Sequence, residues 1–289
     1  MNPIGVHAAV WVGGWSPEQT RVAVESSRRA GYDLIELTAT TPDNVDVDLT
    51  RRLLAEHGLA ATASLGLTFT NDISSDDTAV VDAGRDTLHR ALAVVTAVGA
   101  THLTGVVHSA MAKHPRPATA TGRANAVAVL RELAAAAAPS GVRIGLEVVN
   151  RYESNLVNTT RDALALADDI GADNVVLHLD TYHMNIEEGD LARPVAEAGD
   201  RLGYVHVGES HRGYLGSGTV DFPRFFRALA ASGYGGPITF ESFSSAVVDP
   251  DLSNTLGVWR NLWDDGADLA AHARRFVDDG MRAARASLR

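Results

Sequence analysis

The chain of 289 residues contains no cysteine. Disulfides and thiolate-bound metals are therefore excluded, and any metal must be held by oxygen and imidazole ligands. The apolar runs, such as residues 134–138, are far shorter than the roughly 20 residues that span a bilayer. The first residues also lack a basic segment followed by an apolar one, the pattern of a secretion signal. We therefore expect a cytoplasmic protein that does not enter a membrane.

Basic residues are outnumbered as well. The chain has 25 lysines and arginines against 36 aspartates and glutamates, which gives a formal net charge of −11. A protein that grips phosphate backbones usually carries a basic face. We therefore expect no nucleic-acid partner, and a DNA-repair nuclease is disfavoured. A neutral small molecule would meet no electrostatic penalty from an acidic protein.

Short apolar segments rich in β-branched residues alternate with longer amphipathic or alanine-rich segments along the whole chain. The segments that predict strands are 4–10, 34–38, 60–65, 102–107, 143–149, 174–180, 204–207 and 237–241. The segments that predict helices are 17–30, 49–57, 78–98, 121–138, 160–169, 190–200, 222–232 and 268–286.

The predicted helix boundaries carry their own signals. Ser16 and Gln19 can form a capping box around Pro17 at the first helical position. Five helices are followed by a glycine where a left-handed residue would end them, at Gly31, Gly58, Gly99, Gly171 and Gly233. Eight strand–helix repeats without a linker predict one domain, a (β/α)8 TIM barrel over residues 1–289. A dinucleotide-binding sheet is disfavoured because no G-x-G-x-x-G follows the first strand.

Polar residues stand at the ends of the last four predicted strands, namely Glu147, Asp180, His206 and Glu241. Function in a β/α barrel lies at this end of the strands, so four consecutive strands would each deliver one ligand to the same mouth. Each residue interrupts an apolar run, where a carboxylate is costly unless it is paired or metal-bound. Three carboxylates and one imidazole suit one Mn²⁺, Mg²⁺ or Co²⁺ ion.

Further polar residues follow these strand ends. Glu153 and His183 are candidates for hydrogen bonds to the hydroxyls of a small-molecule substrate, and Arg212 could polarise a developing oxyanion. Salt bridges around the site are the alternative role for each of the three. We expect Arg151 to pair with a neighbouring carboxylate, and His178 to be a core or supporting histidine.

Four segments around these residues resemble the ketose 3-epimerase family, which acts on tagatose, allulose and ribulose and belongs to the xylose-isomerase-like barrels. They are LEVVNRYE at 146–153, LDTYHMNIEE at 179–188, VHVGESHR at 205–212 and FESF at 240–243. The stretch LGVWRN at 256–261 is also similar to the family. The resemblance extends over the whole chain and keeps its order.

The resemblance implies one divalent ion held by Glu147, Asp180, His206 and Glu241. It implies that Glu153, His183 and Arg212 hold the first carbons of a free ketose, and that the protein is a homodimer or homotetramer. Trp15, Leu67 and Phe243 are candidates for the apolar wall, although each could equally pack in the core. The chain departs from some family members at His7 and Met111, which leaves the preferred sugar open.

Inversion at C3 of a ketose needs one base on each face of that carbon. Glu147 and Glu241, on well-separated strands, are predicted to be this pair, working through a cis-enediolate. The examples are D-fructose/D-allulose, L-ribulose/L-xylulose and D-tagatose/D-sorbose. An aldose–ketose isomerase and an inosose dehydratase on the same barrel remain alternatives, as does a sugar-binding barrel without catalysis.

Overall fold

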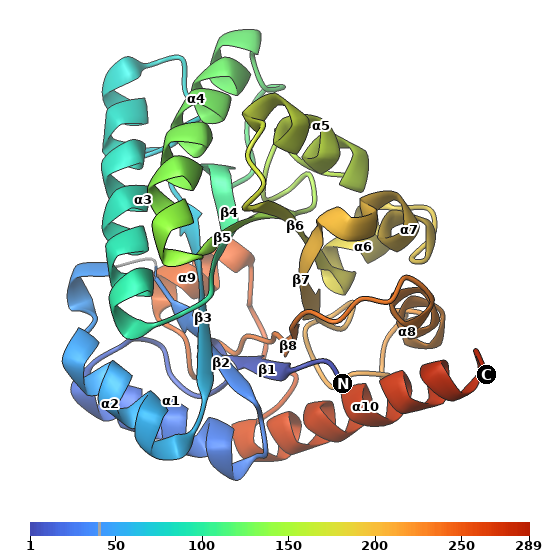
Figure 1. The fold of residues 1–289 in the computed structure, drawn as a ribbon. Helices are drawn as coiled ribbons and strands as arrows, with labels where there is room; N and C mark the ends of the chain where they lie inside the picture. The colour runs from blue at the N-terminus through green and yellow to red at the C-terminus, as the bar shows by residue number, and fades with distance from the viewer. Residues whose placement is uncertain (40–41) are drawn as a thin grey trace.

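In the part of the chain that the structure describes, eight parallel strands follow one another in order around a closed barrel, and β8 pairs with β1 to close the ring (Figure 1). The computed structural model describes residues 1–39 and 42–289. The strands are β1 (Ile4–His7), β2 (Leu34–Thr38), β3 (Ala60–Leu67), β4 (His102–Ala110), β5 (Arg143–Val148), β6 (Val175–Asp180), β7 (Leu202–Val207) and β8 (Ile238–Phe240). The predicted (β/α)8 barrel is confirmed.

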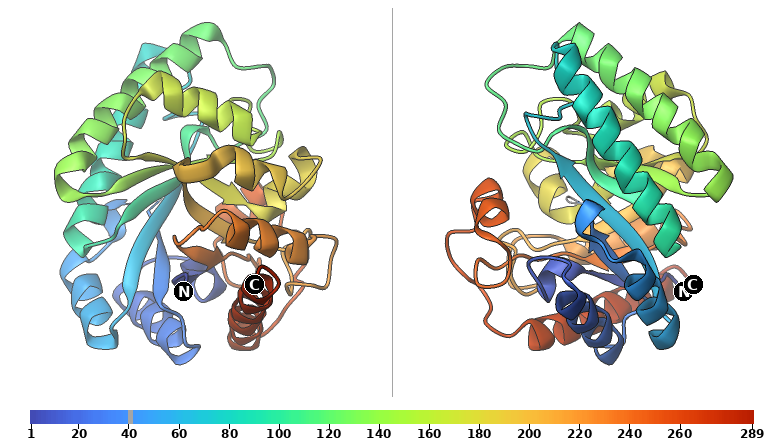
Figure 2. Two further views of the ribbon diagram at one scale, coloured as in Figure 1. Left: turned by 45° about the vertical axis from the view of Figure 1, so that its right-hand side comes forward. Right: turned by 90° about the vertical axis from the view of Figure 1, so that its left-hand side faces the viewer.

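Helices connect the strands and cover the outside of the barrel (Figure 2). They are α1 (Pro17–Arg29), α2 (Val47–His57), α3 (Thr78–Val98), α4 (Ala120–Ala137), α5 (Thr160–Ile170), α6 (Thr181–Glu187), α7 (Arg193–Ala198), α8 (Phe222–Ala231), α9 (Pro250–Leu256) and α10 (Gly266–Ala286). None of the helices within 1–39 and 42–289 is long and apolar enough to cross a membrane.

The helix signals in the sequence act as expected. Ser16 and Gln19 form the capping box at the start of α1, and Pro17 is its first residue. The five predicted stop glycines, Gly31, Gly58, Gly99, Gly171 and Gly233, all have φ between 62° and 82°. An L-residue with a side chain rarely adopts this conformation. Glycine at these positions therefore lets the backbone turn from the end of a helix toward the next strand.

Several predicted boundaries differ from the structure. Strand β1 ends at His7 because residues 8–10 form a 3₁₀ turn, and β4 extends to Ala110. The helix predicted at 190–200 is only α7, while α6 and α9 were not predicted. Both are seven residues long and lie in connections, where apolar periodicity is too short to register.

The interior of the barrel is filled largely by polar side chains, whereas the outer faces of its strands pack against the helices with aliphatic ones. On β7, Tyr204 and His206 alternate with Val205 and Val207, and all four are buried. This alternation follows from the two-residue period of a strand, which sends successive side chains to opposite faces. The barrel interior therefore carries hydrogen-bonding groups that can support a site at its mouth.

Tyr32 lies in the loop between α1 and β2 and connects this loop to the last helix, α10. Its side chain is fully buried, and its hydroxyl donates to the Ala270 carbonyl of α10 at 2.7 Å. We expect Tyr32→Phe to lower the free energy of unfolding by about 1 kcal/mol, the net worth of one buried hydrogen bond. Urea unfolding measures this. Tyr214→Phe is the control, because that tyrosine is only partly buried and its hydroxyl bonds the exposed Asp268 of the same helix at 2.7 Å. An equal loss in both variants would contradict the expectation.

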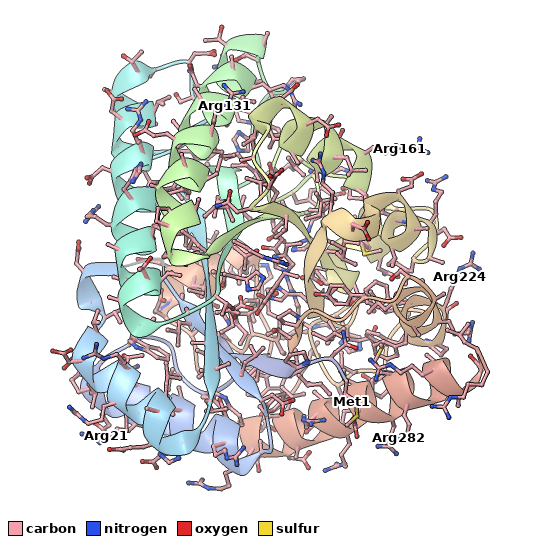
Figure 3. All side chains as sticks on the ribbon, viewed as in Figure 1. Met1, Arg21, Arg131, Arg161, Arg224 and Arg282 are labelled. Carbon is pink, nitrogen blue, oxygen red and sulfur yellow. The ribbon has the colours of Figure 1, made fainter. Side chains whose placement is uncertain are left out.

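The arginines labelled in Figure 3 lie apart from one another on the outer helices and point away from the barrel. Three of them form ion pairs with neighbouring acidic residues: Arg161 with Glu197, Arg224 with Asp190 and Arg282 with Asp278. The charges of these three arginines are each balanced by a neighbouring carboxylate, and the three do not form a single basic face.

Candidate active site

The four polar strand ends meet at one point of the barrel mouth. The Nδ1 atom of His206 lies 3.5 Å from Glu147 Oε1, 3.5 Å from Glu241 Oε1 and 3.9 Å from Asp180 Oδ2. Glu147, Asp180 and His206 are on β5, β6 and β7, and Glu241 directly follows β8. All four side chains are buried. The structure therefore brings the four predicted ligands together.

Two of the converging atoms are buried without a hydrogen-bond partner, His206 Nδ1 and Asp180 Oδ2. The other oxygen of Asp180 accepts the backbone N–H of Tyr182 at 2.7 Å, so only one oxygen faces the cluster. Buried polar atoms are normally paired, and an unpaired carboxylate oxygen beside two further carboxylates is costly. A divalent cation would satisfy all of these atoms, and their chemistry suits a hard or borderline ion.

The two glutamates differ in their electrostatic surroundings. Burial raises the pKa of Glu147 to about 8. Burial also acts on Glu241, but His206 and Arg212 outweigh it, and the pKa of that carboxyl lies below its ordinary value. The difference follows from contact: the Arg212 guanidinium is hydrogen-bonded to Glu241 and not to Glu147. Carboxylates with opposed pKa shifts at one site are typical of acid–base pairs.

Glu36, in the middle of β2, is a site residue that the strand-end pattern missed. Its side chain is fully buried, and Oε2 accepts hydrogen bonds from His206 Nε2 at 2.8 Å and from the Tyr204 hydroxyl at 2.6 Å. Burial opposes its charge, yet the neighbouring His206 holds the pKa of Glu36 below its usual range. The signal in the sequence was a carboxylate inside the apolar run LIELT at 34–38, like those of the four ligands.

His183 is oriented by the loop that follows β5. Its Nδ1 accepts the backbone N–H of Asn150 at 3.1 Å and lies 2.8 Å from the side-chain amide of the same residue. The ring proton is therefore on Nε2, which lies 3.7 Å from Asp180 Oδ2. Burial lowers the pKa of His183 well below its ordinary value, so the ring is neutral. The same Asn150 amide donates to Glu153 Oε1 at 3.0 Å, which places Glu153 beside His183.

Arg212 adopts a left-handed backbone, with φ of 62°, in the loop after β7. Its carbonyl accepts the hydroxyl of Ser242, which in turn accepts the indole N–H of Trp263 at 2.9 Å. The guanidinium carbon lies 3.8 Å from the centre of the Tyr182 ring. Nη1 contacts Glu241 and lies 3.5 Å from Asp180 Oδ2. A strained backbone held by its surroundings is characteristic of a functional position.

We expect Arg212→Lys to lower kcat/KM about 10- to 100-fold. A lysine can neither stack its head group flat on Tyr182 nor present a planar fork of donors. Initial rates with a ketose measure the change. Arg151→Lys is the matched control, because Arg151 is exposed at the same mouth and pairs with Glu187, as expected from the sequence. Equal rates for Arg212→Lys and the parent would refute a role for the guanidinium.

His178 is buried in the barrel interior, next to Glu147 and His206. Its side chain is fully buried, its Nδ1 is 2.8 Å from the Thr104 hydroxyl and 3.9 Å from Glu147 Oε2, and its ring meets that of His206 edge-on. With Nδ1 engaged by Thr104, the structure places His178 as a buried neighbour of two of the four predicted ligands.

A concave pocket opens over the cluster, and small-molecule ligands bind in such concave sites. Its lining includes Glu147, Glu241, Glu153, His183 and Arg212, the polar residues His7, Thr38 and Ser64, and the apolar residues Met111, Phe243, Leu252 and Leu256. The last two belong to α9, which lies at one end of the barrel in the right-hand view of Figure 2.

Of the three predicted wall residues, only Phe243 lines this pocket among the residues that the structure describes. Trp15 packs in the core, because its indole N–H donates to Thr50 of α2 at 3.1 Å. Leu67 is buried in the core as well, and the register between β3 and β4 shifts between Gly66 and Leu67. For Trp15 and Leu67 this placement agrees with core packing, the alternative that the sequence left open.

Comparisons with known proteins agree with this geometry. Residues 24–285 match the family model described as xylose isomerase-like TIM barrel. A ketose 3-epimerase from Arthrobacter globiformis is 52% identical over 280 residues, which cover 97% of this chain and 97% of the relative. An L-ribulose 3-epimerase from Methylomonas sp. is 54% identical over 273 residues, 94% of this chain and 96% of the relative.

A solved structure is equally similar. The crystal structure of a D-allulose 3-epimerase from Methylomonas sp. in complex with D-allulose superposes with a TM-score of 0.95 at 53% identity, covering 96% of each chain. Family model, relatives and solved structure agree over nearly the whole length. The chain belongs to the ketose 3-epimerases of the xylose isomerase-like TIM barrel family.

Proposed function

We propose that this protein interconverts free ketoses at C3. The observation that carries the proposal is the placement of Glu147 and Glu241, whose Oε1 atoms each lie 3.5 Å from His206 Nδ1 but come from β5 and from the end of β8. A substrate above His206 would have one carboxylate on each side. The names of the relatives, ketose 3-epimerase and L-ribulose 3-epimerase, support the same reaction.

Glu147, Asp180, His206 and Glu241 would hold one divalent cation, Mn²⁺, Mg²⁺ or Co²⁺, which supplies Lewis-acid polarisation of the substrate carbonyl. Glu147 takes the proton from one face of C3, leaving a cis-enediolate, and Glu241 delivers a proton to the other face. The roles exchange in the reverse direction. No other acid–base pair is needed for inversion.

The surrounding side chains would orient the sugar. His183 donates from Nε2 toward the oxygens of C1 and C2, since its Nδ1 is engaged by Asn150. Arg212 contributes a second donor for the charge that develops on the C2 oxygen. Glu153, fixed by the Asn150 amide, accepts a hydrogen bond from a hydroxyl of the substrate.

The pocket favours a free sugar over a sugar phosphate. Among the described residues that line it, Arg212 is the one arginine or lysine, and it is already bonded to Glu241. A phosphate would therefore enter an acidic pocket without a free cation to receive it. Candidate pairs are D-fructose/D-allulose, L-ribulose/L-xylulose and D-tagatose/D-sorbose.

Incubation of the Mn²⁺-loaded protein with D-fructose tests the function. We expect D-allulose, and no turnover of D-fructose 6-phosphate under the same conditions. Formation of an aldose would support an aldose–ketose isomerase instead, and loss of water from an inosose would support a dehydratase. Sugar binding without any product would identify a binding barrel and overturn the proposal.

We also infer a cytoplasmic homodimer or homotetramer. Trp259 is 75% exposed in the loop after α9, and Leu262 beside it is exposed as well. Exposed apolar residues that gather near a site often mark a contact surface. Trp263, in contrast, is buried against the barrel. Light scattering of the purified protein measures the assembly, and a monomer would exclude it.

A further inference from the structure

A chain of hydrogen bonds runs from the candidate metal centre down into the barrel. His206 Nε2 lies 2.8 Å from Glu36 Oε2, which also accepts the Tyr204 hydroxyl at 2.6 Å. The Tyr204 hydroxyl lies 2.7 Å from both Thr62 Oγ1 and Thr239 Oγ1. The five side chains come from β2, β3, β7 and β8, and all are buried. Four strands are therefore tied together directly beneath His206.

The chemistry of the carboxylate fixes the direction of the first bond. An ionised carboxylate only accepts hydrogen bonds. The Nε2 atom of His206 must therefore carry a proton and donate a hydrogen bond to Glu36. To bind a metal the ring must be neutral, and its lone pair is then on Nδ1, the atom that faces Glu147, Asp180 and Glu241. Without an acceptor at Nε2, the proton could move to Nδ1 and the ring could rotate.

Tyr204 fixes the position of the Glu36 carboxylate, as Glu36 fixes that of the His206 ring. Its hydroxyl donates to the same Oε2 atom that accepts from His206, and the two threonines lock the phenol from β3 and β8. The second oxygen of Glu36 lies 3.7 Å from His7 Nε2. That second oxygen makes no hydrogen bond to the described residues, so the barrel holds the buried carboxylate through Oε2 alone, by way of His206 and Tyr204.

We propose that Glu36 is a positioning residue of the metal centre, which selects the His206 tautomer and aims Nδ1 at the ion, and that Tyr204 holds Glu36 in place. The proposal rests on the proposed function, because it requires a divalent ion at the four ligands. Partners that orient a metal-bound histidine typically change metal affinity 10- to 100-fold when they are removed.

Titration of the metal-free protein with Mn²⁺, followed by the electron paramagnetic resonance signal of the free ion, tests this directly. We expect Glu36→Gln to weaken Mn²⁺ binding about 10- to 100-fold, since the amide is a poorer acceptor that carries no charge. Tyr204→Phe, which keeps the carboxylate but removes one donor, should weaken it about fivefold.

Tyr32→Phe is the matched control, because it also removes a fully buried phenol hydroxyl but far from the site. It should lose stability and keep the parental Mn²⁺ affinity. A purely structural role for Glu36 and Tyr204 predicts that all three variants lose stability and none loses affinity, and that result overturns the proposal. If Glu36→Gln does not fold, Tyr204→Phe against Tyr32→Phe decides in the same way. A parental protein that binds no Mn²⁺ would instead overturn the proposed function.

Discussion

Glu147→Gln and Glu241→Gln are each expected to lower kcat for C3 epimerisation by about 10³- to 10⁴-fold, the range associated with loss of a positioned acid–base group. Glutamine keeps the size of the side chain and one oxygen for the ion, but it cannot take up a proton at the pH of the reaction. Epimerisation needs both glutamates in every turnover, so neither single variant can bypass the loss. Product formation from D-fructose measures it.

Exchange of the C3 hydrogen with solvent separates the two bases. In Glu147→Gln, Glu241 can still remove and return the proton on its own face. This variant should therefore incorporate deuterium from heavy water into one epimer without inverting it. Glu241→Gln should show the same exchange in the other epimer. Glu187→Gln is the control, since that carboxylate pairs with Arg151 and does not line the pocket. Full activity in both site variants would end the two-base mechanism.

Removal of the metal is expected to abolish turnover and to destabilise the fold. An ion at about 100 times its Kd stabilises the folded protein by about 2.7 kcal/mol. For a chain of this length, that corresponds to a shift in Tm of roughly 4–5 °C. The effect should be large because buried carboxylates of Glu147, Asp180 and Glu241 face one another without the ion. Thermal melts with chelator and with restored Mn²⁺ measure it.

The same melts identify the ion's location. His206→Ala should lose the increase in Tm that Mn²⁺ produces in the parent, because the only imidazole among the four predicted ligands is gone. His272→Ala should keep it, since His272 lies on α10 and bonds the Leu215 carbonyl at 2.9 Å. A parental Mn²⁺ response in His206→Ala would place the ion elsewhere.

The convergence of the four ligands was predictable because it depends on topology alone. Parallel strands in a closed barrel bring their carboxyl ends to one mouth, so Glu147, Asp180, His206 and Glu241 had to approach one another once the eight repeats were recognised. The orientation of His183 was less accessible. It depends on the turn that aims the Asn150 amide at its ring, and no spacing rule encodes that contact.

Glu36 was not predicted because it lies in the middle of β2, whereas the predicted ligands were recognised by their position at strand ends. Its neighbours in space, His206 and Tyr204, are 170 and 168 residues away along the chain. Trp15 and Leu67 show the reverse difficulty. Apolar side chains next to a site can face either the pocket or the core, and the sequence pattern does not show which; both residues belong to the core.

Helix α9 contributes side chains to the wall of the pocket but none to the cluster of predicted ligands. Leu252 and Leu256 are the side chains of α9 that supply this part of the wall. Changes in residues 250–256 are therefore expected to reshape one wall of the pocket while Glu147 and Glu241 keep their places. Directed evolution of sugar preference would best begin in this segment, because it can drift without a penalty in chemistry.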